Sequence, residues 1–163
     1  MKKIPLFLVA FFLYGYSTVR AQEHTGAVKH KDSAHIMFNA MDLKWGDGPS
    51  SLPKGVQMAV LEGNPSKEGM FTLRATVPAN YKIPPHWHPV TEHVTVLEGS
   101  LYMGMGEKLD ESKAIELKPG GFAAMPANTA HYAFTKDKCV IQLHAMGPFA
   151  ITYINPADDP RTR

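Results

Sequence analysis

The chain has 163 residues, of which 44% are hydrophobic and 20% charged, a composition typical of one globular domain. Its single cysteine, Cys139, can form neither an internal disulfide nor a cysteine-based zinc site. Outside residues 1–21, 14 basic and 15 acidic residues give a formal charge of −1. Such a balance offers no electrostatic reason to expect nucleic acid as a partner.

Residues 1–21 have the features of a signal peptide. Lys2 and Lys3 precede an apolar run that is too short to span a bilayer comfortably, and Val19-Arg20-Ala21 forms a small-x-small cleavage site. We therefore expect an exported protein, periplasmic or secreted, with no stable membrane insertion after cleavage. A retained membrane anchor is the alternative interpretation.

The remainder of the chain has the pattern of an all-β protein. Residues 22–34 are polar and non-periodic, which is typical of a loose leader. Short apolar runs follow, separated mostly by Gly and Pro turn signals, and no long window has a helical period. Strands are expected over 56–61, 70–77, 93–98, 100–105, 113–117, 121–125, 131–135, 138–145 and 149–154. The pattern predicts one sandwich or barrel domain over 35–155, with a polar tail over 156–163.

Histidines gather in one short proline-rich segment. His86 and His88 are two residues apart, so in an extended strand their side chains project from the same face. Glu92 has the same parity and follows a bend, so it can return on a neighbouring strand as a carboxylate ligand. His93 has the opposite parity and is a reserve ligand, because the bend makes its direction uncertain.

A remote histidine, His131, completes a candidate ligand set with His86, His88 and Glu92. Three neutral imidazoles and one carboxylate suit a divalent transition metal, and the donors alone do not distinguish Zn, Fe, Mn, Ni and Co. Four ligands on an octahedral ion leave two positions for water, substrate or dioxygen. We expect such a centre to attract a small anionic or bidentate oxygen ligand.

This spacing resembles the first motif of the cupin superfamily, which runs Gly-x5-His-x-His-x3–4-Glu-x6-Gly. The corresponding residues in this chain are Asn80, His86, His88, Glu92 and Gly99. Asn80 departs from the motif glycine, but Asn is the non-glycine residue that best tolerates positive φ. The turn is therefore expected to keep its geometry.

The second cupin motif runs Gly-x5-Pro-x-Gly-x2-His-x3-Asn. Its positions are held here by Gly120, Pro126, Asn128, His131 and Thr135. Asn128 again replaces a glycine, and Thr135 replaces the final Asn at a position that supplies no ligand. The resemblance implies a small exported single-domain metal-binding cupin, folded as a jelly-roll β-barrel with the metal inside near one mouth.

The resemblance also implies a function. It indicates a metal-dependent enzyme, of dioxygenase, isomerase, decarboxylase or lyase type, that acts on a small oxygen-rich molecule. In this interpretation Glu92 is the catalytic residue, able to leave the metal and serve as a base. The alternatives are a metal-centred binding or sensing module without turnover, and a barrel in which metal only stabilises the fold.

Other polar residues on the predicted strands could line the pocket. Gln142 and His144 share a strand face, and if it points inward they could hydrogen-bond a metal ligand or substrate. The alternative is that they pair within the sheet or face a partner subunit. Arg74 could bind a substrate carboxylate or lie on the outer face. Assembly as a homodimer is expected on the resemblance, because cupins are often dimers through strand edges.

Overall fold

Two antiparallel β-sheets form almost all of the regular structure. The computed structural model describes residues 35–162, so the expected signal peptide and leader lie outside the described residues. The strands are β1 (Gly46–Asp47), β2 (Gln57–Glu62), β3 (Gly69–Val77), β4 (Lys82–Trp87), β5 (Glu92–Glu98), β6 (Leu101–Met105), β7 (Ile115–Leu117), β8 (Phe122–Met125), β9 (His131–Phe134), β10 (Cys139–Gly147) and β11 (Thr152–Tyr153). Four 3-10 turns accompany them: η1 (Ala40–Asp42), η2 (Glu111–Lys113), η3 (Pro156–Asp158) and η4 (Pro160–Thr162).

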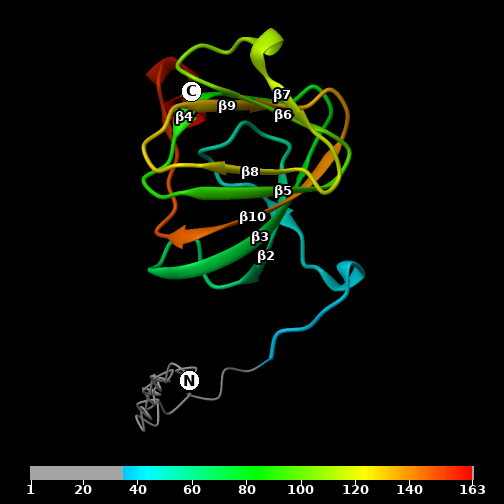
Figure 1. Ribbon diagram of the computed structural model, residues 1–163. Helices are drawn as coiled ribbons and strands as arrows, with labels where there is room; N and C mark the ends of the chain where they lie inside the picture. Colours follow the sequence, from blue (N-terminus) through cyan, green and yellow to red (C-terminus); the bar gives the residue numbers. More distant parts are fainter. Residues whose placement is uncertain (1–34, 163) are drawn as a thin grey trace, which may run out of the picture. The chain divides into compact units, whose positions relative to one another are not determined.

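The sheets form two layers that face each other (Figure 1). One has six strands in the order β1-β2-β3-β10-β5-β8, and the other has five in the order β11-β4-β9-β6-β7. Strands distant in sequence are therefore neighbours, as where β10 lies between β3 and β5. This is the jelly-roll arrangement, and the predicted all-β fold class is confirmed.

The strand pattern differs from the expected one at a few places. The short β1 was not expected, and β4 crosses a Pro84-Pro85 pair where the register with β9 shifts. Two prolines can lie in a strand only where the ladder is interrupted, because each lacks an N–H. The run expected over 149–154 contributes only two strand residues, β11. The expected tail contains η3 and η4 within residues 156–162, and Asn155 caps the first of these turns.

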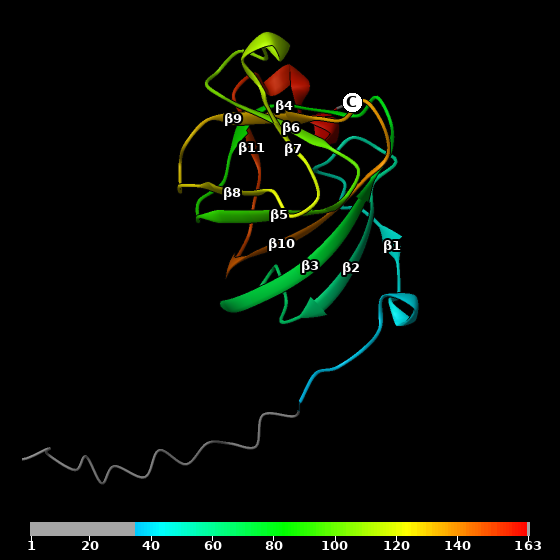
Figure 2. The ribbon, with the colours of Figure 1, turned by 45° about the vertical axis from the view of Figure 1, so that its right-hand side comes forward.

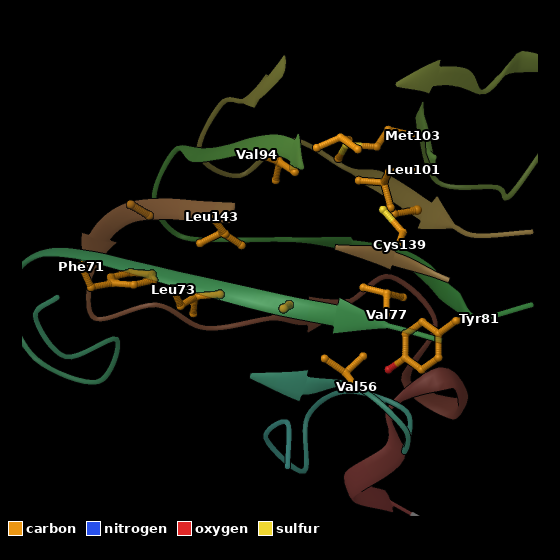
Figure 3. Close-up of a cluster of buried hydrophobic side chains, with 14 residues drawn as sticks. Val56, Phe71, Leu73, Val77, Tyr81, Val94, Leu101, Met103, Cys139 and Leu143 are labelled. Atoms are coloured by element: carbon orange, nitrogen blue, oxygen red, sulfur yellow. The ribbon is translucent and has the colours of Figure 1, made fainter. Parts of the chain in front are cut away.

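Alternate residues of the strands fill the space between the sheets (Figure 3). On β3 the buried positions alternate with half-exposed ones, as expected for a strand with one face on the core. Cys139 is completely buried there, and burial raises the pKa of its thiol to about 11. The residue therefore packs as a small hydrophobe.

The two asparagines that replace motif glycines adopt the glycine-like conformation. Asn80 has φ 56° and Asn128 has φ 57°, the left-handed region that Asn tolerates better than other side chains. Thr135, which replaces the last motif residue, is buried and donates through Oγ1 to the Pro78 carbonyl at 2.6 Å. It also accepts from the Tyr81 amide at 3.1 Å, so it closes the turn before β4.

Among the described residues, no helix is long and apolar enough to cross a membrane.

Candidate metal centre

Three histidines from two stretches of the chain meet inside the barrel. His86 lies near the end of β4, His88 follows this strand, and His131 begins β9, where it pairs with His86 across the sheet. All three are buried, and one ring nitrogen of each lies within 4.8 Å of the others. The side chains of His86 and His88 project to the same site, in agreement with their spacing of two residues.

Two of these rings are held by the backbone immediately before them. His86 Nδ1 lies 2.7 Å from the carbonyl oxygen of Pro84, and His131 Nδ1 lies 2.9 Å from that of Thr129. A carbonyl only accepts, so in each neutral ring Nδ1 carries the proton and donates it. The second nitrogen, Nε2, then has a free lone pair, which is the form in which imidazole binds a metal.

The third ring is held from a distant part of the chain. His88 Nδ1 lies 2.7 Å from the carbonyl oxygen of Ala150, which belongs to the segment between β10 and β11. The neighbouring Phe149 stacks on His88 with ring centroids 4.3 Å apart and an angle of 21° between the planes. This segment therefore sets both the tautomer and the tilt of His88.

The Nε2 atoms point at each other and at a carboxylate. Nε2 of His88 and of His131 are buried and have no hydrogen-bond partner among residues 35–162. Glu92 lies between them, with Oε1 3.7 Å from His88 Nε2 and Oε2 3.4 Å from His131 Nε2. Lone pairs that face lone pairs in a buried space are unfavourable, and a cation among them removes the conflict. The donor set therefore fits a metal ion.

The protonation states also suit a cation. Burial, with the adjacent His131 and His88 imidazoles, lowers the pKa of His86 to about 3, and burial lowers the pKa of His88 as well. Burial raises the pKa of the Glu92 carboxyl, but the imidazoles of His131, His88 and His86 outweigh this effect and hold the pKa below its ordinary value. At neutral pH the site therefore offers His86 and His88 as neutral imidazoles and Glu92 as an ionised carboxylate.

A small cavity of about 50 Å³ adjoins the cluster. Most of its wall is apolar; the lining residues are Val77, Tyr81, Ile83, His86, Glu92, Val94, Leu101, Met103, His131, Ala133, Phe134, Thr135 and Ile141. The hydroxyl of Tyr81 donates to the Pro53 carbonyl and that of Thr135 to the Pro78 carbonyl. The polar atoms left for a ligand are thus concentrated at the His–Glu end.

The reserve ligand is not part of this cluster. His93 follows Glu92 on β5 and pairs with His144 of β10 in the register of the six-stranded sheet. Their rings stack with centroids 4.7 Å apart and planes 1° apart. Both lie on the side of the sheet opposite to Val94 and Leu143, which belong to the core. His93 and His144 therefore face away from the barrel interior.

Gln142 and Arg74 lie on the same outward side. Arg74 Nε donates to Gln142 Oε1 at 3.2 Å, across the pairing of β3 with β10. The inward orientation considered for these residues is therefore wrong: the structure brings His93, Gln142, His144 and Arg74 to the outer face, where none of them reaches the cavity. The inward side of β10 carries the core residues Cys139 and Leu143 instead.

The groups that orient the rings were missed. For His86 and His131 the acceptor is the carbonyl two residues earlier, a local relation that the two motifs contain but that was not considered. For His88 the acceptor lies 62 residues away, and no sequence signal at Ala150 distinguishes it. Phe149 is one of many aromatic residues, so its stacking on His88 was equally hidden.

Comparisons with known proteins place the chain in a family. The model of the family described as "Domain of unknown function (DUF4437)" matches residues 14–152. A curated relative from Oryza sativa subsp. japonica, "Putative germin-like protein 2-3", is 35% identical over 79 residues, which cover 44% of this chain and 35% of the rice protein. The match thus spans about a third of the curated relative's length.

Solved structures share the fold at low sequence identity. The polyketide cyclase RemF from Streptomyces resistomycificus matches with TM-score 0.64 and 21% identity, covering 76% of this chain and 88% of its own. A protein of Methylibium petroleiphilum PM1 described as a "putative acetylacetone dioxygenase" matches with TM-score 0.58 and 19% identity, over 80% and 88% of the two chains. An RmlC-like cupin is also among the matching structures. The chain belongs to the DUF4437 family and has the cupin fold.

Proposed function

We propose that this protein is a metal-dependent cupin enzyme that transforms a small molecule in the cavity beside His86, His88, Glu92 and His131. The observation that carries the proposal is the state of the three imidazoles. Each has its Nδ1 proton engaged by a backbone carbonyl, one ring nitrogen of each lies within 4.8 Å of the others, and the free nitrogens of His88 and His131 face the Glu92 carboxylate. Such anchoring is typical of metal-ligating histidines.

The proposed ion is a divalent transition metal. Three neutral nitrogen donors and one carboxylate oxygen form a mixed set that suits Zn, Fe, Mn, Ni or Co, and lacks the all-oxygen character preferred by Mg and Ca. With one negative ligand, the centre keeps a net charge of +1. When bound, the ion supplies Lewis acidity or redox chemistry for an oxygen-bearing substrate.

The four residues of the site have two different proposed roles. His86, His88 and His131 remain fixed by their carbonyl partners, so the donor atoms need no reorganisation during a reaction. Glu92 is the proposed catalytic base: a carboxylate oxygen can accept a proton from the substrate while the imidazoles retain their positions. Its buried location excludes bulk water from that transfer.

The cavity favours a substrate with oxygen atoms at one end and an apolar body. Its volume of about 50 Å³ holds roughly three or four water molecules, so the substrate is small. A sugar would leave several hydroxyls without partners against Val94, Leu101 and Met103, which is unfavourable. A diketone or a phenolic would place its oxygens at the His–Glu end. Acetylacetone, named for one protein of this fold, has this character.

The test is turnover by metal-loaded protein. Purified protein is loaded separately with Fe(II), Mn(II), Zn(II), Ni(II) or Co(II) and offered small diketones, phenolics, carboxylic acids and sugars. Oxygen uptake and product formation are measured. We expect conversion of an apolar-bodied oxygen ligand with at least one ion and none of sugars. The E92Q variant should lose turnover, whereas H93Q, which changes a histidine outside the cluster, should retain it.

Two outcomes would contradict the enzyme proposal. Tight binding of one compound without product, for every ion, would instead establish a binding or sensing module. No metal retained by protein with intact fold would remove the basis of either function. Elemental analysis of protein isolated from its own compartment shows whether metal is retained and identifies the ion.

We also propose that the chain is exported after cleavage behind Ala21. The support is the basic start, the short apolar run and the small-x-small site in residues 1–21. Cell fractionation with N-terminal sequencing tests the proposal: Gln22 is the expected first residue in the exported fraction. A chain that keeps residues 1–21 and sediments with membranes would show a retained anchor.

A further inference from the structure

A hollow lies on the outer face, which is the side of the six-stranded sheet that points away from the core. In this sheet β3, β10 and β5 lie side by side (Figure 2). The ladder between β10 and β5 ends at the pair His144–His93, whereas β10 continues to Gly147. The β5 side of the last residues of β10 is therefore open. The hollow has a volume of about 390 Å³ and is lined by Met70, Val90, Thr91, His93, His144, Ala145 and Met146.

Two methionines of this hollow lie directly opposite each other. Met70 of β3 pairs with Met146 of β10 in the register of the sheet, and opposed residues of antiparallel strands project from the same face with Cβ atoms roughly 5 Å apart. The two residues are 54% and 56% exposed, so the pair is open to solvent. A methionine side chain is unbranched and flexible, which allows both thioether sulfurs to turn to one point between the strands.

A histidine places a nitrogen donor beside the two sulfurs. His144 precedes Met146 by two residues on β10, so both side chains project from the same face. Neither ring nitrogen of His144 has a hydrogen-bond partner within residues 35–162. Its ring stacks on His93 with centroids 4.7 Å apart, and His93 also stacks on Phe122. This stack supports the plane of His144 without using either of its nitrogens.

Only one of the two stacked imidazoles can serve an ion in the hollow. The ring planes of His93 and His144 are 1° apart, so their lone pairs run parallel and do not converge on one point. In addition, Nδ1 of His93 is buried. His144 is therefore the nitrogen donor, and His93 is its support.

The donors of the hollow carry no negative charge. No carboxylate, lysine or arginine is among its lining residues. The acidic residues that pair with the outward positions lie farther away, Glu62 on β2 and Glu98 at the other end of β5. Arg74 donates to Gln142. A divalent ion held by neutral donors alone would keep its full charge, which is costly to desolvate, whereas two thioethers and one imidazole suit a soft monovalent ion.

We propose that Met70, Met146 and His144 bind one Cu(I) ion, as a second metal site separate from the His–Glu cluster inside the barrel. Soft thioether ligands select Cu(I) over divalent ions, whereas the carboxylate and imidazoles of the inner cluster favour divalent ions. The two sites lie on opposite faces of the six-stranded sheet, since Glu92 projects inward and the adjacent His93 projects outward. Each site can therefore be filled independently of the other.

Competition with a chromophoric chelator measures the affinity. Protein preloaded with Zn(II) is titrated anaerobically with Cu(I), kept reduced by ascorbate, against bathocuproine disulfonate. We expect one Cu(I) per chain. M70L and M146L retain the apolar side-chain volume but remove a sulfur donor, so each should weaken Cu(I) binding by more than about tenfold, since even changes outside the ligand set cost that much. M41L is the matched control, because Met41 is exposed to 94% and lies outside the hollow.

Two results of this titration would refute the proposal. One is equal Cu(I) affinity in the wild type, M70L and M146L. The other is a loss of Cu(I) in H131A, which has an incomplete inner cluster, together with retention in M146L, because this would place the ion inside the barrel.

Ag(I), a soft monovalent ion that needs no reductant, identifies the donor residues. In protein labelled with carbon-13 at the methionine methyl groups, Ag(I) should shift the two resonances that are missing from M70L and M146L. H144Q should weaken Ag(I) binding, whereas H93F, which keeps a ring for stacking and has no ring nitrogen, should not. Shifts confined to other methionines, no shift at all, or equal losses in H93F and H144Q would overturn the assignment.

Discussion

One group of histidines lies inside the barrel and another on the outer side of the six-stranded sheet, and only the inner group is arranged for a divalent metal. Glu92 and His93 are consecutive on β5, yet Glu92 joins His88 and His131 inside while His93 joins His144 outside. Alternation along the strand separates them. Histidine content alone therefore does not identify a metal centre; the face from which each side chain projects decides its surroundings.

The rings of the two groups also differ in how they are held. Inside, the three ring planes are inclined to one another by 47° to 73°, and each Nδ1 is tied to a backbone carbonyl. Outside, the planes of His93 and His144 are parallel, and His93 Nδ1 is without a hydrogen-bond partner in the part of the chain described. Lone pairs in parallel stacked planes do not converge on one point, so the two outer imidazoles cannot share one ion.

The largest expected effect is a loss of bound divalent metal, which should occur in a variant of the inner histidines and not in a variant of the outer pair. H131A should lose most of the bound metal, because it removes one of three anchored nitrogen donors. H144A should retain the wild-type amount, since His144 lies on the outer face. Elemental analysis of both purified variants, with circular dichroism to confirm folding, gives the measurement. Equal metal in H131A and the wild type would end the assignment of the inner cluster.

Two phenylalanines, one stacked on a histidine of each group, should differ in how much they contribute to the stability of the fold. Phe149 stacks on His88 and packs edge-on against Phe71 in the core, whereas Phe122 stacks on His93 and is half-exposed. We expect F149A to lower the free energy of unfolding by about 2 kcal/mol and F122A by less than about 0.5 kcal/mol in the monomer. Urea unfolding of the metal-free proteins measures both. Similar losses would show that the two stacks are equivalent.

The turn before His131 should produce a smaller effect. Asn128 has positive φ, and its backbone N–H donates to the His88 carbonyl at 2.7 Å. N128A places a Cβ-bearing residue without Asn's tolerance in the left-handed region, at a cost of about 1 kcal/mol, while N128G should remain near wild type. Thermal unfolding compares the two. A glycine variant as unstable as the alanine variant would assign the role to the Asn side chain.

The smallest expected effect concerns an interior group with no part in the chemistry. Burial raises the pKa of Cys139 to about 11, so at pH 8 the thiolate fraction is lower than for a free cysteine, and the thiol is also shielded. A thiol reagent should label the folded protein slowly and the urea-unfolded protein rapidly. Fast labelling of the folded state would reveal an opening of the core. Cys139 thus illustrates that a residue can lie inside the barrel without taking part in the proposed chemistry.

Sequence alone was informative where a local rule governs the outcome. Strand parity grouped His86 with His88, and the tolerance of Asn80 for positive φ held in the structure. Parity could not decide which face of β10 is inward, because polar Gln142 and His144 alternate with apolar residues on a strand covered on one side only. The inward face of β10 is identified only by the pairing of this strand with β3 on one edge and β5 on the other.

Relations over long sequence separations were beyond reach. No sequence pattern near Ala150 indicates that its carbonyl orients His88. The exposure of Met37 and Met41 was also hidden, since a hydrophobic residue before a strand is equally consistent with burial. Such features depend on which segments the folded chain brings together, and no local pattern records that information.

Main-chain oxygens, present whatever the side chains, orient all three imidazoles. Mutational drift cannot delete these acceptors unless it moves the backbone. The residues of the cavity wall can therefore diverge among descendants, changing which molecules fit, while the donor atoms stay in place. This separation of a fixed reactive centre from a replaceable lining gives the scaffold its evolvability.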